Sequence, residues 1–197
     1  LVTHGFTRDE VGAKMSKSVG NTIDPQKVIN ESGAEILRLW VSYVDYGQDV
    51  TVGPEIFKKV SESYRRIRNT MRFLLGVVGS MKETDLVPVK DLDFVDKWAL
   101  HQFNQLIEEV TVNFDNFSFH KVYHALNHFF AVQLSATYMD ILKDRLYCDS
   151  VDSARRRSSM TVMYHMTREL TKMMAPILSF LSDEVYDYLP GPKKESI

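Results

Sequence analysis

The stretch PEIFKKVSESYRRIRNTMRFLLGVVG, residues 54–79, decides the fold of this chain. Its apolar side chains recur at the three- and four-residue spacing of an α-helix, and arginines fill positions between them. This pattern predicts one long helix that ends near Gly79 and buries a single face. The apolar stripe comprises Ile56, Val60, Ile67, Met71, Leu74 and Val78.

The sequence after this stretch continues the helical pattern and has almost no strand signal. Residues 80–93, with Pro88, are expected to form a linker or crossover. Three helices and a last helical segment should follow: residues 94–114, 119–147 after Ser118 as N-cap, 154–175, and 176–189 starting at Pro176. Because short connections favour antiparallel neighbours, residues 51–197 are predicted to form an antiparallel helical bundle, so the fold is mainly α.

Residues 1–50 are predicted to form a separate unit that precedes the bundle. A short strand is expected over residues 1–6. A helix then begins at Pro25 with Asp24 as its N-cap, and Gly33 ends it, because proline suits the first helical position and glycine the position after the last turn. A second helix is expected over residues 34–46.

The composition describes a folded, nearly neutral chain. Its 197 residues carry a formal net charge of −2, so a polyanion would have to be held by a local basic patch. Cys148 is the single cysteine, which excludes an internal disulfide and a multi-cysteine zinc site and suits a reducing compartment. No apolar run approaches the roughly 20 residues that span a bilayer, so we expect a cytoplasmic protein without membrane association. Because the chain starts at Leu1 inside the expected strand, we expect a piece of a larger protein.

A polar loop, GAKMSKSVGN at residues 12–21, lies between the expected strand and the first helix. Lys14 and Lys17 are three residues apart, with Ser16 and Ser18 beside them. The flanking glycines let such a loop move, so both ammonium groups can converge on one anion, such as a leaving pyrophosphate. Composition alone fits a solvated basic loop as well, and the spacing is not that of a Walker loop.

Arginines form a second basic feature, on the long helix quoted first. Arg65, Arg68 and Arg72 stand at i, i+3 and i+7, so they project from one face while the apolar stripe takes the other. Such a ridge can contact the phosphates of a nucleic acid, which gives an affinity that falls with salt. A solvated face paired with carboxylates such as Glu62 is the alternative.

Two further clusters are interpreted as structural. His120, His124 and His128 repeat every four residues, but no carboxylate shares their ladder, so no metal site is expected. The three arginines at residues 155–157 stand at a helix start, where cations oppose the macrodipole unless a carboxylate such as Asp149 or Asp152 lies nearby. The methionines are interpreted as core residues, among them Met71, Met139, Met163, Met166, Met173 and Met174.

The sequence KMSKS at residues 14–18, followed by Val-Gly-Asn, is letter for letter the signature loop of class I aminoacyl-tRNA synthetases. Most of the chain resembles the isoleucyl-tRNA synthetase family, with its characteristic stretches in the same order. They are GAEILRLWV, DYGQDV, YRRIRNTMRFLL, YMDILKDRLY, RRRSSMTVMYHM and MMAPILSFLSDEVYDYLPG. Valyl-, leucyl- and methionyl-tRNA synthetases share the loop and the helical domain and stay open as alternatives, as does a non-catalytic helical interaction module.

This resemblance implies that the chain consists of parts of two domains with different roles. Residues 1–50 would be the end of a Rossmann-type catalytic domain with its stem-contact segment, and residues 51–197 the anticodon-binding domain. The family activates its amino acid with ATP and Mg²⁺ to an adenylate and transfers the acyl group to tRNA, here isoleucine and tRNA(Ile).

The resemblance also assigns roles to the loop and the arginines. Lys14 and Lys17 would be catalytic, stabilising charge on the triphosphate, and Lys17 is the stronger candidate. Ser16 and Ser18 would hydrogen-bond phosphate or hold the closed loop, and Met15 would anchor it, so the ATP-binding set spans these five residues. Candidate tRNA ligands would be Arg65, Arg68 and Arg72.

Other parts of the family's machinery are missing from these residues. The family's HIGH-like ATP motif, the amino-acid pocket and the editing domain are absent from the sequence, so the isolated piece is expected to be inactive. No cofactor is expected on it, because ATP and Mg²⁺ belong to the full enzyme and a zinc ion would belong only to a C-terminal module outside this sequence. We expect a monomer.

Overall fold

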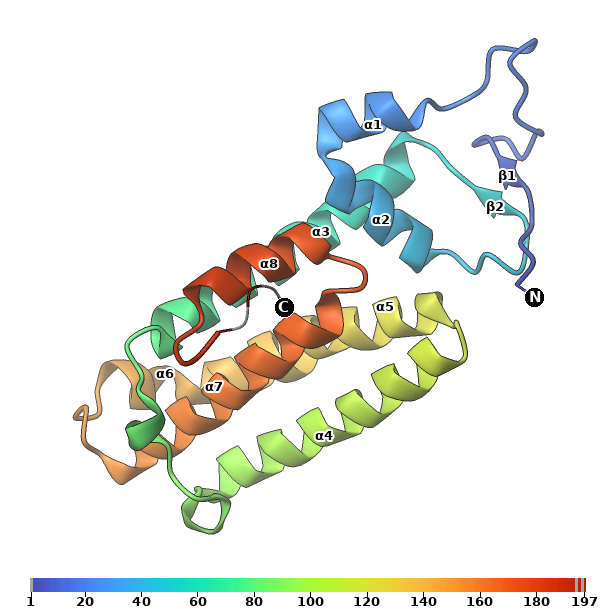
Figure 1. The fold of residues 1–197 in the computed structure, drawn as a ribbon. Helices are drawn as coiled ribbons and strands as arrows, with labels where there is room; N and C mark the ends of the chain where they lie inside the picture. Colours follow the sequence, from blue (N-terminus) through green and yellow to red (C-terminus); the bar gives the residue numbers. More distant parts are fainter. Residues whose placement is uncertain (1, 194, 196) are drawn as a thin grey trace.

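The computed structural model describes residues 2–193, 195 and 197. Long helices lie side by side in an elongated bundle, and a small amino-terminal segment, residues 2–53, sits at one end of it (Figure 1). The predicted mainly helical fold is confirmed. None of the helices in the described part of the chain is long and apolar enough to cross a membrane.

The bundle consists of helical rods joined by short connections. Their bounds are α3 (Pro54–Val78), the 3₁₀ turns η1 (Glu83–Asp85) and η2 (Val89–Asp91), α4 (Phe94–Asp115), α5 (Phe119–His128), the π-helix η3 (Phe129–Tyr138), α6 (Met139–Tyr147), α7 (Ala154–Met174) and α8 (Ser179–Tyr188). α4 packs against α5, α3 against α7, and α7 against α8. The predicted helices are present, except that the last one begins at Ser179 rather than at Pro176, because residues 175–177 form a turn. Their packing encloses one core.

The amino-terminal segment contains two short strands and two helices: β1 (Thr7–Arg8), α1 (Pro25–Ser32), α2 (Ala34–Tyr43) and β2 (Val50–Thr51). β1 pairs with β2 in parallel. The predicted N-cap of α1 is confirmed, because the Asp24 carboxylate accepts a hydrogen bond from the N–H of Gln26 at 2.9 Å. α2 packs on α3 and α5, which joins this segment to the bundle.

Two predicted boundaries in this segment are wrong. The strand expected over residues 1–6 lies instead at β1, because β2 pairs only with Thr7 and Arg8 while Phe6 stays exposed; Leu1 lies outside the described residues. The helix expected to reach residue 46 ends at Tyr43, because Val44 has an extended backbone with φ −86° and ψ 147°.

The apolar stripe of α3 lies at the centre of the core. Five of its predicted members are at most 3% exposed: Val60, Ile67, Met71, Leu74 and Val78. Burying a side chain of this size contributes about 1.5–3 kcal/mol. The core methionines are confirmed as well: Met71, Met163, Met166 and Met174 are buried, and Met139 and Met173 pack against the core while partly exposed.

The helix predicted over residues 119–147 is interrupted by the π-helix η3, in which the backbone bonds span five residues. Phe130, Leu134 and Tyr138 follow one another at four-residue spacing, and each is at most 1% exposed. In an α-helix of 3.6 residues per turn, side chains four apart drift by about 40° at each step. The wider winding of η3 reduces this drift and keeps all three side chains in the core.

Asp96 is fully buried on α4 and gathers a polar network that ties α4 to η3, α6 and α7. Its carboxylate accepts hydrogen bonds from the hydroxyls of Tyr138 and Ser158, each at 2.6 Å. Arg145 Nη1 lies 3.3 Å from the same carboxylate, and its Nη2 lies 2.9 Å from Asp93. Burial, reinforced by the negative charge of Asp96, raises the pKa of the Tyr138 hydroxyl far above its ordinary value, so the hydroxyl remains a donor.

We expect Asp96→Ala to lower the free energy of unfolding by about 3–5 kcal/mol, because Arg145 loses a buried counter-charge and the hydroxyls of three residues lose an acceptor: Tyr138, Ser158 and Ser159. Chemical denaturation measures this difference. The matched control is Asp140→Ala, which removes an exposed pair with Lys143 (Nζ to Oδ1 2.6 Å) on the neighbouring rod. That loss should change stability by less than about 1 kcal/mol, and equal effects of the two substitutions would contradict the assignment.

Candidate functional site

The segment between β1 and α1 extends away from the bundle, at the far end of the molecule (Figure 1). It contains the lysine loop, residues 12–21. Gly12 and Gly20 have φ values of 81° and 77°, a left-handed conformation that glycine adopts without strain. These two glycines turn the chain on either side of residues 14–18, which leaves that stretch projecting from the segment.

Asp9 and Asn21 brace the base of the lysine loop. Asn21 Nδ2 donates to Asp9 Oδ2 at 2.8 Å, and Asn21 Oδ1 accepts the N–H of Ser16 at 2.9 Å. Asp9 also accepts the N–H of Ala13 at 2.7 Å. The hydrogen bond from Asn21 lowers the pKa of the Asp9 carboxyl below its usual value, so the brace is fully charged at neutral pH.

Arg8 fastens the loop to the residues that precede β2. Its Nε donates to Asp49 Oδ2 at 2.7 Å, and its Nη1 donates to the carbonyl of Gly12 at 3.0 Å. Asp49 also accepts the N–H of Phe6 at 2.8 Å. The Phe6 N–H and the Arg8 guanidinium together hold the pKa of Asp49 below its ordinary value. The guanidinium of Arg8 is therefore committed to holding the loop.

The two lysines of the loop have exposed ammonium groups without carboxylate partners among the described residues. Lys14 and Lys17 are exposed, and neither forms an ion pair with a carboxylate in the described part of the chain. Lys14 Nζ lies 5.0 Å from the centre of the Phe6 ring. Both ammonium groups are therefore available to an external anion.

Neutral groups of the loop complete the candidate set. The hydroxyls of Ser16 and Ser18 lie 2.7 Å apart, and the N–H of Ser18 points to Ser16 Oγ at 3.3 Å. Met15 is half-buried and packs against the hydrophobic core. Two cations, two hydroxyls and an apolar anchor suit an anion with several oxygens, because each charged oxygen can accept a charge-assisted hydrogen bond.

The arginine stripe lies on the exposed face of α3, and two of its members face α8. Arg68 and Arg72 line a groove of about 610 Å³ between the two helices, which we call the arginine groove, whereas Arg65 is not one of its lining residues. Arg68 Nη2 lies 3.8 Å from Glu184 Oε1 on α8, and both side chains are more than half exposed. Such an exposed pair is weak and can be exchanged for a ligand.

The floor of the arginine groove is apolar. Leu75, Leu181 and Val185 line it, and at Gly76 the absent side chain leaves open space. The ring of Tyr188 stands at the groove and is 70% exposed. A planar group can stack on this ring while its phosphates meet the arginines.

The basic helix start at residues 155–157 has a structural explanation. Arg155 donates to the Asp149 carboxylate from Nε at 2.9 Å and from Nη2 at 2.8 Å, and Arg156 Nη1 donates to the Asp149 carbonyl at 2.9 Å. The predicted compensation by Asp149 is confirmed. These two arginines are therefore committed to holding the start of α7.

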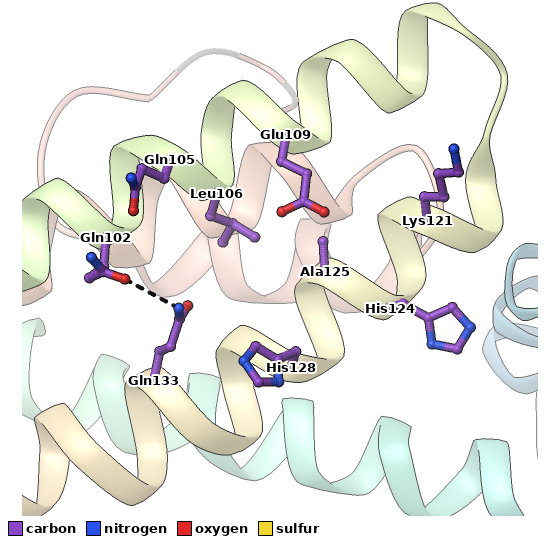
Figure 2. Close-up of a pocket in the computed structure, with 9 residues that line it drawn as sticks. All are labelled: Gln102, Gln105, Leu106, Glu109, Lys121, His124, Ala125, His128 and Gln133. Carbon is purple, nitrogen blue, oxygen red and sulfur yellow. Dashed lines mark hydrogen bonds between the residues drawn. The ribbon is translucent and has the colours of Figure 1, made fainter.

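A polar groove of about 440 Å³ lies between α4 and α5, and His124 and His128 line it together with Glu109 (Figure 2). The His124 ring packs edge-on against Tyr43 with centroids 5.8 Å apart, and burial lowers its pKa. Among the described residues, no three His, Cys, Asp or Glu side chains are placed to hold a metal ion. The packing of His124 agrees with the structural interpretation of this ladder.

Sequence reasoning missed the groups that hold these sites in place. Asp9, Asn21 and Asp49 act through side-chain bonds, one of which joins residues 43 positions apart, and the ion pair of Arg68 comes from α8 rather than from Glu62. The one available signal was Asn21 at the end of the lysine loop, because an amide can donate and accept hydrogen bonds at once.

We expect Asn21→Ala to free the lysine loop without unfolding the chain. The amide of Ser16 should exchange hydrogen about tenfold faster or more, because it loses its acceptor on Asn21, while the amide of Ala13 keeps its bond to Asp9. Amide hydrogen exchange measures both. Asn30→Ala, which removes an exposed bond on α1, is the control; a Ser16 amide equally protected in both variants would contradict the brace.

Comparison with known families gives two matches. A family model described as the anticodon-binding domain of tRNA ligase matches residues 96–197. A second, described as class I tRNA synthetases (I, L, M and V), matches residues 1–53, which include the lysine loop.

Curated relatives match almost the whole chain. The isoleucine-tRNA ligases of Symbiobacterium thermophilum and Desulfitobacterium hafniense are each 48% identical, over 98% and 97% of this chain. The isoleucine-tRNA ligase of Nitrosococcus oceani is 45% identical over 100% of it. The chain spans about a fifth of the length of these relatives, 21% in each case.

Solved structures share the fold. The ternary complex of Agrobacterium radiobacter K84 agnB2 LeuRS, tRNA and LeuAMS matches 96% of this chain and 22% of its own with a TM-score of 0.74 and 20% identity. The Mycobacterium tuberculosis methionyl-tRNA synthetase in complex with methionyl-adenylate matches 93% of this chain and 37% of its own, with a TM-score of 0.75 and 22% identity. At these identities the likeness concerns the fold alone.

Proposed function

This chain belongs to the family of tRNA-ligase anticodon-binding domains, and on that premise we propose that it is part of a class I isoleucine-tRNA ligase. The full enzyme would activate isoleucine with ATP as the adenylate and pass the acyl group to tRNA(Ile). The observation that carries the proposal is the lysine loop, which holds the KMSKS sequence in a braced loop with both ammonium groups exposed. The names of relatives at 45–48% identity support isoleucine as the amino acid.

The lysine loop would act on the triphosphate of ATP. As the isoleucine carboxylate attacks the α-phosphorus, the bond to pyrophosphate breaks and negative charge grows on the leaving group. A lysine 4 Å from a phosphate charge gains about 1 kcal/mol in bulk water and about 4 kcal/mol near a partly desolvated surface. Closure of the loop over ATP would therefore make Lys14 and Lys17 effective, with Mg²⁺ on the phosphate oxygens sharing the charge.

The remaining loop residues would support that closure. The paired hydroxyls of Ser16 and Ser18 can turn from each other to phosphate oxygens, since a hydroxyl both donates and accepts. Met15 would keep the loop attached to the amino-terminal segment while the lysines move, because its side chain packs against the core. The Asp9–Asn21 brace sets the base about which the loop closes.

The bundle would hold the tRNA. Arg68 and Arg72 would meet backbone phosphates, and Arg65 would extend the same ridge one turn towards the amino-terminal segment. The exposed ring of Tyr188 would stack on an unpaired base at the arginine groove. The amino-acid pocket and the second ATP motif would belong to other parts of the enzyme, so these residues alone would not charge tRNA. We infer a cytoplasmic monomer with tRNA(Ile) as its macromolecular partner.

The loop assignment predicts the effect of Lys17→Ala in the full-length ligase. ATP–pyrophosphate exchange should fall about 10²–10³-fold, the usual loss when a group that stabilises transition-state charge is removed. Stability should change by less than about 0.5 kcal/mol, because the side chain is exposed. Lys27→Ala, which removes an exposed lysine paired with Glu31 on α1, is the control. A normal exchange rate in the Lys17 variant would refute the role of the loop.

The groove assignment predicts the effect of Arg72→Ala on tRNA binding. Affinity should drop, and the slope of log K against log salt should become shallower by about one, because one phosphate contact is lost. Lys172→Ala, which removes an exposed lysine paired with Glu169 on α7, should leave the slope unchanged. Filter binding at several salt concentrations measures both, and an unchanged slope for Arg72→Ala would exclude it as a phosphate ligand.

A further inference from the structure

Two side chains of α2 fasten the amino-terminal segment to the bundle, and we call them the α2 latch: Glu35 and Arg38. The Arg38 guanidinium donates to the carbonyls of Pro176 at 2.9 Å and Ile177 at 2.8 Å, and to Ser179 Oγ at 3.0 Å. These acceptors lie in the turn between α7 and α8 and at the first residue of α8. One planar, rigid group therefore fixes that turn to α2 at three points.

Glu35 holds the start of α8. Its Oε1 accepts the N–H of Phe180 at 3.0 Å, one of the first backbone donors of α8, which has no partner within its own helix. Glu35 is 8% exposed, and its Oε2 has no hydrogen-bond partner in the described part of the chain. The buried carboxylate therefore gives this N–H the acceptor that its own helix cannot supply.

α8 connects the α2 latch to the arginine groove. Glu184 lies one helical turn after Phe180 and pairs with Arg68 across the groove. Tyr64 lies one turn before Arg68 on α3; burial raises its pKa, and Glu35, Arg68 and Glu184 all act on it electrostatically. Along α8, the contact with the α2 latch at Phe180 and the groove residue Glu184 are therefore one helical turn apart.

α2 also leads back to the lysine loop. α1 packs on α2, and α1 begins at Pro25, four residues after Asn21 of the brace. The chain leaves α2 towards Asp49, which Arg8 holds beside the same loop. α2 is thus one of the elements through which the loop and the groove are placed relative to each other.

We propose that Glu35 and Arg38 are positioning residues that orient the lysine loop relative to the arginine groove, so that tRNA held by the bundle reaches the catalytic side in a productive orientation. This inference rests on the proposed function as part of a tRNA ligase. Neither residue belongs to the lysine loop, so amino-acid activation does not need them. Neither lines the arginine groove, so tRNA binding does not need them either. Acyl transfer needs the catalytic side and the tRNA-binding bundle together. It is therefore the step that the α2 latch controls.

Arg38→Lys in the full-length ligase tests this inference, because lysine keeps the charge but cannot reach three acceptors in a fixed fork. The kcat for charging tRNA(Ile) should fall about tenfold, the scale of a small misplacement of reacting groups. ATP–pyrophosphate exchange without tRNA and the Kd for tRNA(Ile) should both stay within about twofold of the wild type, because loop and groove are intact.

Two further variants and a control sharpen the experiment. Glu35→Ala should likewise lower the kcat for charging while exchange and the Kd for tRNA(Ile) stay near the wild-type values. In the double variant the fold-loss in kcat should be smaller than the product of the two single losses, because both residues hold one turn. If Arg38→Lys lowers the unfolding midpoint, Ser179→Ala provides a milder test, because it removes only one acceptor of Arg38. Glu31→Ala, an exposed carboxylate of α1, is the control and should leave all three parameters unchanged.

The alternative outcomes are distinct. An unchanged kcat for charging overturns the inference, and so does a parallel loss of exchange, binding and charging, which would show a merely structural role. Weaker tRNA binding with normal kcat would also overturn it, because it would place the two residues in the binding surface. A wild-type enzyme that does not charge tRNA(Ile) at all would instead refute the proposed function on which the inference rests.

Discussion

The burial of one face of α3 is the interaction on which the remaining architecture depends. This helix of 25 residues starts against α2, runs through the bundle and contacts α7, α8 and η3 on the way. At 1.5 Å per residue it spans about 37 Å. Its apolar stripe closes the core, and that packing fixes the opposite face, so the arginines must face outward beside α8. The same helix therefore sets both the stability of the bundle and the place of its basic groove.

Charge is distributed in two contrasting ways. Inside the bundle, Asp96 and Arg145 are surrounded by hydroxyls and a second carboxylate, as buried ions must be. At the lysine loop, the anionic Asp9 is bonded to backbone and to Asn21, while Lys14 and Lys17 are left in solvent without carboxylate partners among the described residues. At these two sites the charged groups that build the structure are satisfied within it, whereas Lys14 and Lys17, which are assigned to phosphate, stay exposed.

Much of the fold follows from periodicity, because burial imposes it residue by residue. The stripe of α3, the cap of α1 by Asp24 and the pairing of Arg155 with Asp149 are local consequences of sequence and were predicted. The π-helix η3 was not predicted, since a change of hydrogen-bond register leaves the apolar content of the segment unaltered.

Contacts made across the chain, such as Arg38 with the turn before α8, depend on tertiary packing that no local pattern encodes. The KMSKS loop could be recognised by its letters, but the brace that holds it required the structure. The division between residues 1–50 and 51–197 remains a prediction.

We propose that this chain binds a transfer RNA and that the RNA is the isoleucine acceptor. Filter binding of the chain to purified isoleucine, valine, leucine and methionine acceptor tRNAs, each at two salt concentrations, tests this directly. We predict preference for the isoleucine acceptor at both concentrations and weaker binding to every tRNA at the higher one, because phosphate contacts release counterions. Equal affinity for all four acceptors, or binding that does not respond to salt, would contradict the account.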